Sequence, residues 1–244
     1  MENNPSYSKE RLPVPPGAKK IHERIHDLLS SLSRSNVRSC LEPEFKQPWN
    51  DTLCLVDHYQ QEIASAAHVT MSCGTGCTAC CCHWVEDVNS FEAEIIADYI
   101  KGRFPDRVSG IAAQCRNDDR RLRSLNEIVE TKINALNPRG SNNALDPVDV
   151  LLASFYQLRQ PCPLLDEKDG TCIAYPVRPL TCRMYISFSD PSRCNPEYIN
   201  ADDIPTYLFD LEEEADRIID TLHFKFLKFE NDTGLRSLLL KYLS

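Results

Sequence analysis

The sequence predicts a mainly α-helical protein whose helices form a scaffold around two irregular, cysteine-rich metal-binding loops. Apolar residues recur at intervals of three and four over most of the chain, which is the period of an amphipathic helix. Five of the twelve cysteines lie within residues 73–82, and a second group extends from residue 162 to residue 194. We therefore expect a flexible arm over 1–17, a helical extension over 18–70, a cysteine-cluster domain over 71–200 and a helical segment over 201–244.

The N-terminal part predicts two helices. The first covers about residues 18–35, where apolar residues from Ile21 to Leu32 lie on one face. Proline-containing breaks at residues 42–43 and 47–48 precede a second helix over about 51–68. Its expected buried stripe contains Leu55, Tyr59, Ile63 and Ala66.

Helix-start patterns mark the later elements. Asn89 is followed three residues later by Glu92, and Asp146 stands directly before Pro147. Residues 137–143 have the composition of a linker, and residues 164–173 that of a short hairpin around a turn. The helices expected from these signals and from the apolar period cover about residues 89–102, 106–136, 146–160 and 203–229, followed by a short one near the C-terminus.

Charge and hydropathy restrict the partners. The chain of 244 residues has a formal net charge of −9, so we expect neither a nucleic acid nor a membrane partner. The basic run 116–123 is interrupted by Asp118 and Asp119 and is interpreted as a solvated helix face. The longest uncharged stretch, residues 69–85, is too polar to span a membrane. Without a leader pattern at the N-terminus, we expect a cytoplasmic protein with reduced thiols.

The first cysteine group has the spacing of a metal-binding knuckle. It contains Cys73, Cys77, Cys80, Cys81 and Cys82. Two thiolates in a Cys-x-x-Cys arrangement can converge on one metal ion. Gly74 and Gly76 supply the backbone freedom that a sharp loop needs.

The second cysteine group is more widely spaced, and its thiols suit a segment that wraps around a site. Adjacent side chains such as Cys80 and Cys81 point in different directions, so both rarely bind one tetrahedral ion. This predicts two nearby ions or one polynuclear cluster, with Cys82 as a spare thiol. The two groups lie about 90 residues apart in the sequence, so bringing them together costs entropy, and bound metal would offset that cost by on the order of 10 kcal/mol. We therefore expect the metal to be needed for the fold. Arg178 and Arg183 are expected to hydrogen-bond the sulfurs and to lower their excess negative charge, or else to pair with surface carboxylates.

The two groups together resemble the YkgJ-type cysteine-cluster family, which is described as zinc- or iron-chelating. The resemblance rests on the first group, on the stretch from Cys162-Pro to Arg178-Pro and Cys182-Arg, and on the trailing Cys194. It covers residues 73–194, and flagellin lysine N-methylases have a similar cysteine pattern. The resemblance implies zinc or iron as cofactor, the iron alone or in an iron–sulfur cluster. The ligands that it implies are Cys73, Cys77, Cys80, Cys81, Cys162, Cys172, Cys182 and Cys194.

Several alternatives stay open at this stage. The protein could be a metal-chelating protein without catalysis, or an iron–sulfur-dependent enzyme such as a protein lysine N-methyltransferase. A radical enzyme is disfavoured because its barrel of alternating strands and helices is not apparent, and a disulfide scaffold is disfavoured in a reducing compartment. His83 and Cys82 leave the ligands at that corner undecided.

Other candidate residues have structural interpretations. Cys40, Cys54 and Cys115 are interpreted as apolar fillers, and His22 and His26 as solvent-facing histidines. Glu92 and Glu94 are interpreted as partners of the helix dipole before a catalytic role is considered.

Overall fold

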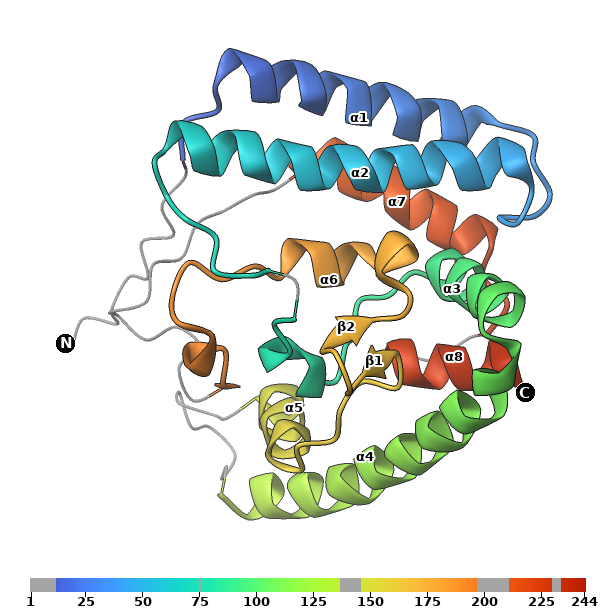
Figure 1. Ribbon diagram of the computed structural model, residues 1–244. Coiled ribbons are helices and arrows are strands. Elements are labelled where there is room, and N and C mark those ends of the chain that lie inside the picture. Colours follow the sequence, from blue (N-terminus) through green and yellow to red (C-terminus); the bar gives the residue numbers. More distant parts are fainter. Residues whose placement is uncertain (1–11, 75, 137–145, 197–210, 230–233) are drawn as a thin grey trace.

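The structure is a computed structural model that describes residues 12–74, 76–136, 146–196, 211–229 and 234–244, and the side chains of 134–136 lie outside this description. Helices dominate it, as the sequence predicts, and its strands form one short hairpin (Figure 1). The principal helices are α1 (Pro16–Arg34), α2 (Pro43–Ala66), α3 (Ser90–Arg103), α4 (Val108–Leu136), α5 (Pro147–Gln157), α6 (Leu180–Met184), α7 (Glu212–Lys225) and α8 (Leu235–Leu243).

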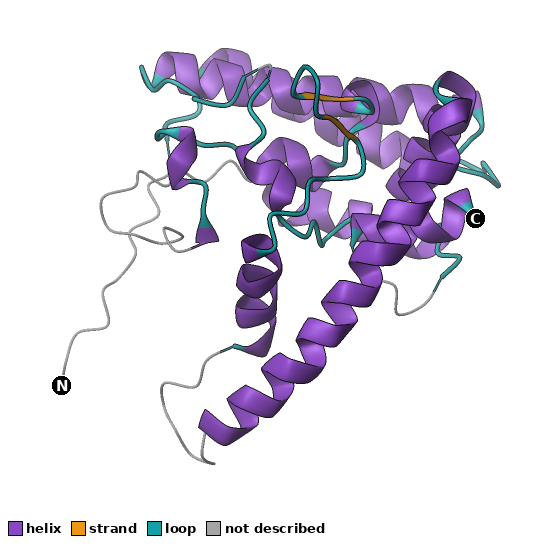
Figure 2. Cartoon of the chain, turned by 60° about the horizontal axis from the view of Figure 1, so that its bottom comes forward, coloured by secondary structure: helices purple, strands orange, loops and turns teal. Residues whose placement is uncertain are grey.

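Helices α1 and α2 form a pair along one side of the molecule, and α7 packs against α1 (Figure 1). On the other side α4 packs against α5 and α8, while α3 contacts α8. Figure 2 shows that the C-terminal part of α4 projects away from the body together with α5. The cysteine-bearing segments lie between these two sides (Figure 1).

Helix α2 begins earlier than predicted and continues through Pro48. Its first turns bury Phe45 and Trp49, whose rings contact Phe91 of α3 edge to face at 5.5 and 4.8 Å. Burial of such aromatic side chains stabilises by several kcal/mol, which is comparable with the cost of about 3 kcal/mol for proline within a helix. The expected break is therefore absent.

The buried stripe of α2 is also displaced from the predicted one. Leu53 and Val56 are buried, whereas Leu55 is only half-buried. Tyr59 and Ile63 belong to the core as expected. The displacement follows from the earlier helix start, because Phe45 and Trp49 fix the rotation of the helix against α3.

Helix starts follow the sequence signals closely. The Asn89 backbone N–H donates to Glu92 Oε2 (3.1 Å) at the start of α3, and the Val148 N–H donates to the Asp146 carboxylate (2.8 Å) at the start of α5. Each bond satisfies an N–H group that the helix itself leaves unpaired. The hairpin is present as β1 (Leu165–Asp166) paired antiparallel with β2 (Thr171–Cys172).

Part of the sequence prediction lies outside the described residues. This holds for most of the N-terminal arm, for the linker 137–143 and for residues 203–210 of the expected C-terminal helix. In the part of the chain that the structure describes, no helix is long and apolar enough to cross a membrane.

Candidate metal centre

The first cysteine group folds into a tight loop that ends in a short 3₁₀ helix, η1 (Ala79–Cys82). The Cys77 N–H donates to the Gly74 carbonyl at 3.1 Å, and the Cys81 N–H donates to the Thr78 carbonyl at 2.9 Å. Gly76 has φ = +86°, a backbone conformation that favours glycine. Gly74 has no such conformation, so only one of the two predicted glycine roles applies.

The second cysteine group passes through several short elements. Cys162 precedes the hairpin, Cys172 ends β2 and Cys182 lies within α6. Cys194 directly follows the 3₁₀ helix η4 (Pro191–Arg193). The four cysteines of this group therefore lie on four different short elements of the chain.

Backbone contacts join the two groups side by side. The Cys162 N–H donates to the Cys81 carbonyl (2.7 Å), and the Ser72 N–H donates to the Ser187 carbonyl (2.8 Å). The hairpin turn also reaches the first loop, because a Cβ on Gly170 would lie 3.1 Å from the Gly76 carbonyl oxygen. Segments about 90 residues apart in sequence are thus neighbours, as the cysteine pattern led us to expect.

Contacts at the far end of the second group complete this junction. The Ser187 N–H donates to the Cys73 sulfur at 3.1 Å. One ring nitrogen of His83, Nε2, lies 2.9 Å from the Cys194 carbonyl oxygen, so a hydrogen bond already occupies that nitrogen. The His83 ring also contacts Tyr156 and Tyr185, with ring centroids 4.4 and 5.6 Å away. These contacts give His83 a structural role beside Cys82.

The thiols influence one another in two sets. In the first set, burial raises the pKa of Cys194, and negative charge on Cys73, Cys80 and Cys77 raises it further. In the second set, burial raises the pKa of Cys182, and charge on Cys162, Cys80 and Cys172 adds to the effect. We assign Cys73, Cys77, Cys80 and Cys194 to the first set and Cys81, Cys162, Cys172 and Cys182 to the second, and the charge of Cys80 also raises the pKa values of Cys81, Cys162 and Cys182.

Cys80 and Cys81 connect the two sets. The Cys81 thiol donates a hydrogen bond to the Cys80 sulfur, which lowers the pKa of Cys80 and raises the pKa of Cys81. Charge on Cys80 also raises the pKa of Cys182, a member of the other set. A bound cation would reverse this mutual repulsion, because coordination to a metal deprotonates a thiol.

The described residues do not contain a finished coordination site. Among them, no three side chains of Cys, His, Asp or Glu are already grouped as metal ligands. Seven of the eight predicted ligands are half-buried and Cys73 is exposed, so the sulfurs retain space to turn about their Cα–Cβ bonds. Thiolate donors are the ligands that suit zinc and iron–sulfur clusters, so the donor chemistry fits these metals.

Arg178 and Arg183 pair with a carboxylate instead of hydrogen-bonding sulfur as we expected. Both guanidinium groups contact Asp57 of α2, Arg178 at 3.5 Å. Arg183 is 2% exposed and also donates to the Pro176 carbonyl at 2.9 Å. The positive charge of Arg178 nevertheless lowers the pKa of Cys80, so it favours the thiolate through space.

Glu92 links α3 to α6, the helix that carries Cys182, through a hydrogen bond. Its carboxylate accepts from the Leu180 N–H (2.8 Å) at the start of α6 and from the Asn89 N–H (3.1 Å). Burial raises the pKa of Glu92. Glu94 pairs with Lys228 at 2.5 Å. Both carboxylates therefore have structural partners, but only Glu92 lies in the first turn of α3, where the dipole interpretation applies, because Glu94 pairs with Lys228 instead.

A buried ion pair that the sequence does not reveal holds both cysteine groups. Arg236 of α8 is 0% exposed and Asp118 of α4 is 1% exposed, with Nε and Oδ2 3.1 Å apart. The Arg236 guanidinium also donates to the carbonyls of His83 (2.8 Å) and Gln160 (3.3 Å). These two carbonyls flank Cys82 and Cys162, so one side chain fixes the backbone of both groups.

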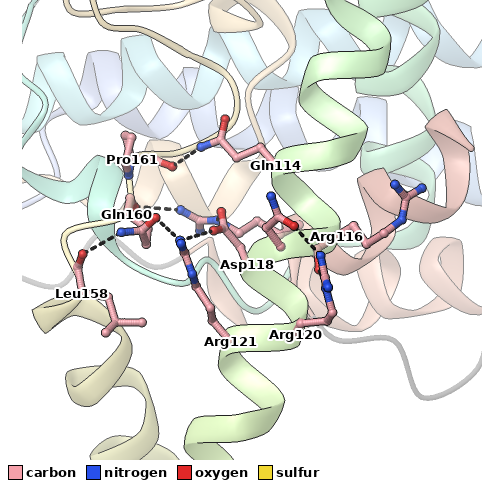
Figure 3. A network of polar contacts seen from close by, with 10 residues as sticks. Gln114, Arg116, Asp118, Arg120, Arg121, Leu158, Gln160 and Pro161 are labelled. Carbon is pink, nitrogen blue, oxygen red and sulfur yellow. Dashed lines mark hydrogen bonds and ion pairs between the residues drawn. The ribbon is translucent and has the colours of Figure 1, made fainter.

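Figure 3 shows how α4 supports the start of the second group. Gln114 donates to the Pro161 carbonyl at 2.9 Å, and Arg121 contacts both Gln160 and Asp118. The prediction of a solvated charged face over 116–123 is therefore wrong for Asp118. The signal was obscured because the partner of Asp118 lies 118 positions away on α8.

Gly234, directly before α8, completes this junction. It has φ = +88°, and a Cβ there would lie 2.6 Å from Trp84 Nε1 and 2.8 Å from the Val85 carbonyl oxygen. The Leu235 N–H donates to the same carbonyl at 2.8 Å. Only glycine permits the C-terminal helix to approach the segment after the first cysteine group so closely.

The remaining cysteine and histidine predictions have mixed outcomes. Cys40 and Cys115 are buried as predicted, but Cys54 is exposed, because it lies on the outer face of α2. His22 and His26 are half-buried, and both face the C-terminal part: His22 Nε2 lies 3.1 Å from the Leu211 carbonyl oxygen, and His26 pairs with Glu214 of α7 at 3.3 Å. The interpretation as solvent-facing histidines is therefore wrong.

Comparison with known proteins gives no relative: no family model, no curated protein and no solved structure matches the chain. The likeness to YkgJ-type proteins thus rests on the cysteine motif alone.

Proposed function

We propose that the protein binds zinc or iron between its two cysteine groups, in a centre of the kind implied by the resemblance to YkgJ-type proteins. The observation that carries this proposal is the contact between the groups, above all the 2.7 Å hydrogen bond from the Cys162 N–H to the Cys81 carbonyl. It makes residues from both groups neighbours in a protein whose described cysteines are all free thiols. Such a concentration of thiols is an oxidation hazard unless the sulfurs bind something.

A division of the eight thiols into two sets of four would supply two metal positions. The first would use Cys73, Cys77, Cys80 and Cys194, and the second Cys81, Cys162, Cys172 and Cys182. Four sulfurs suffice for one tetrahedral zinc ion or for one iron–sulfur cluster. The hydrogen-bonded pair Cys80 and Cys81 would then belong to different positions, which avoids the unfavourable case of adjacent residues on one ion.

Metal analysis tests this proposal directly. We would purify the full chain without oxygen and measure zinc, iron and acid-labile sulfide per chain. Zinc without colour supports chelation, and iron with sulfide supports an iron–sulfur protein and favours the alternative of an iron–sulfur-dependent enzyme such as a protein lysine N-methyltransferase. A folded, reduced protein that contains no metal would refute the metal centre.

Matched serine variants test the ligands. Cys77→Ser and Cys182→Ser should each lose metal, one from each set, whereas the controls Cys54→Ser and Cys115→Ser should retain it. Far-ultraviolet circular dichroism of all four variants reports whether the helices persist. Equal metal content in the four folded variants would contradict the ligand assignment.

A further inference from the structure

A cavity of about 560 Å³ lies beside the cysteine groups. It is bounded by the segment that follows η1, by the first half of α5 and by the end of α6, and Figure 1 shows α6 above and α5 below that segment. The walls thus come from four separate parts of the chain, because Pro196 also lines the cavity. This volume suits a small organic molecule.

Three carboxylates contribute to its lining, namely Glu86, Asp87 and Asp149. No lysine or arginine lines the cavity, and within the described part of the chain none of the three carboxylates has an ion-pair partner. Burial, together with the charge of Asp87, raises the pKa of Glu86, which indicates that the negative charge there is not compensated. The cavity is therefore a favourable place for a positive charge.

The other walls are aromatic and aliphatic. The rings of Trp84 and Tyr185 and the side chains of Val150 and Leu152 share the lining with the carboxylates. Trp84 is 4% exposed, and its ring contacts Phe155 edge to face at 5.1 Å, which keeps it in position. A flat ring beside a carboxylate attracts organic cations through both the charge and the π-electrons, and the Trp84 ring already has one cation against it, because the Arg236 guanidinium carbon lies 5.5 Å from its centre.

A simpler structural explanation accounts for only one of the carboxylates. Asp149 lies in the first turn of α5, where a negative charge favours the helix dipole. Glu86 and Asp87 lie in no helix, and Asp87 has φ = +49°, an uncommon backbone conformation for an aspartate. The segment thus places two adjacent carboxylates at the cavity at the expense of backbone strain.

We propose that this cavity binds a small organic cation, with an ammonium or amidinium head at the carboxylates and an apolar body against the aromatic wall. The proposal does not depend on the metal centre, because the charged and aromatic groups that carry it are not among the proposed ligands. Cys80 and Cys182 do line the cavity, so the bound cation would lie next to both sets of thiols.

Calorimetric titration of the full chain tests this site with a matched pair of probes. Phenethylammonium has a charged head and an aromatic body, and 2-phenylethanol has the same body without charge. We expect phenethylammonium to bind with a Kd of roughly 1 mM or lower and at least about tenfold more tightly than 2-phenylethanol. Its affinity should fall as sodium chloride is added, because the attraction is electrostatic.

Charge-removing variants locate the binding. The double variant Glu86→Gln/Asp149→Asn should weaken phenethylammonium binding at least about tenfold, since two charges are lost at nearly constant shape. Asp27→Asn, a change of an exposed carboxylate on α1, should leave the affinity unchanged. Metal content is measured on the same samples, so loss of the cation site and loss of the metal centre are separate results.

Three results would overturn the proposal. These are equal affinity for the charged and the neutral probe, unchanged affinity in the folded double variant, and displacement of phenethylammonium by an equal concentration of Mg²⁺. The last result would assign the carboxylates to a divalent metal ion.

Discussion

Replacement of Arg236 by methionine tests the framework that holds the two cysteine groups. The change leaves the Asp118 carboxylate, 1% exposed, without its buried cation. Breaking a buried ion pair from one side costs about 3–5 kcal/mol, and the carbonyls of His83 and Gln160 also lose a donor. Arg121 remains 3.5 Å from the other carboxylate oxygen, so we expect the lower end of this range, about 3 kcal/mol.

Urea unfolding followed by circular dichroism measures this loss. With a slope of up to about 3 kcal/mol per M, the midpoint should fall by about 1 M or more while the slope stays constant. The surface pair Arg217 and Glu213 serves as the control, because these side chains are 69% and 86% exposed. Arg217→Met should change the free energy of unfolding by less than about 0.5 kcal/mol.

A double-mutant cycle separates the ion pair from the other contacts of Arg236. Asp118→Leu combined with Arg236→Met removes both charges, so the double variant should lose less stability than the sum of the two single variants. The reasoning is refuted if the buried pair shows no more coupling than the surface pair, or if Arg236→Met loses less than about 1 kcal/mol.

Two further predictions concern the ends of α8 and α3. Gly234→Ala should lower the free energy of unfolding by at least about 2 kcal/mol, because its methyl group would collide with the Trp84 ring and the Val85 carbonyl at a positive φ. Gly110→Ala is the control, since it lies in an open helical position and should raise the free energy of unfolding by about 0.5 kcal/mol. Equal effects of the two changes in urea unfolding would contradict this reasoning. Burial lowers the pKa of His223, and its Nδ1 accepts from the Ser90 N–H at 3.2 Å. The unfolded chain therefore binds the proton more readily, so His223 contributes a loss of stability as pH falls below about 6.5. His223→Gln should reduce this loss, and parallel stability-against-pH curves for the variant and the unsubstituted protein would exclude the role of His223.

Local sequence signals predicted the helix starts well because the interactions concerned are themselves local. Asn89 with Glu92 spans one helical turn, and Asp146 caps the helix that begins at the next residue. Pro48 misled the prediction because its local cost is offset by distant aromatic packing. A period in the sequence also leaves the rotation of a helix uncertain by about one residue, which explains why Val56 is buried where Leu55 was expected.

Of the candidate site, the sequence predicted only the cysteines and the meeting of their two groups. Cysteine spacing indicated that the two groups meet, and the Cys162 to Cys81 contact agrees with it. Cysteine spacing gave no indication of the buried ion pair between Asp118 and Arg236, because single charged residues in amphipathic helices ordinarily face solvent. Asp57 was missed for the same reason, since its arginine partners follow it by more than 120 residues.

Three structural side chains around the cysteines, those of Arg236, Glu92 and Arg183, have one property in common: each binds the backbone of a cysteine-bearing segment and not a sulfur. Arg236 binds the carbonyl that follows Cys82, and Glu92 binds the N–H two residues before Cys182. Arg183 binds carbonyls within the second group while its charge is balanced by Asp57 of α2. The helices can therefore hold both groups in place through main-chain hydrogen bonds. The thiols are then not needed for these contacts and stay available for a ligand. The sequence predicts that the metal is needed for the fold, whereas these main-chain contacts predict that serine variants of the proposed ligands lose metal before they lose helix. Metal analysis and circular dichroism on the same variants decide between the two expectations.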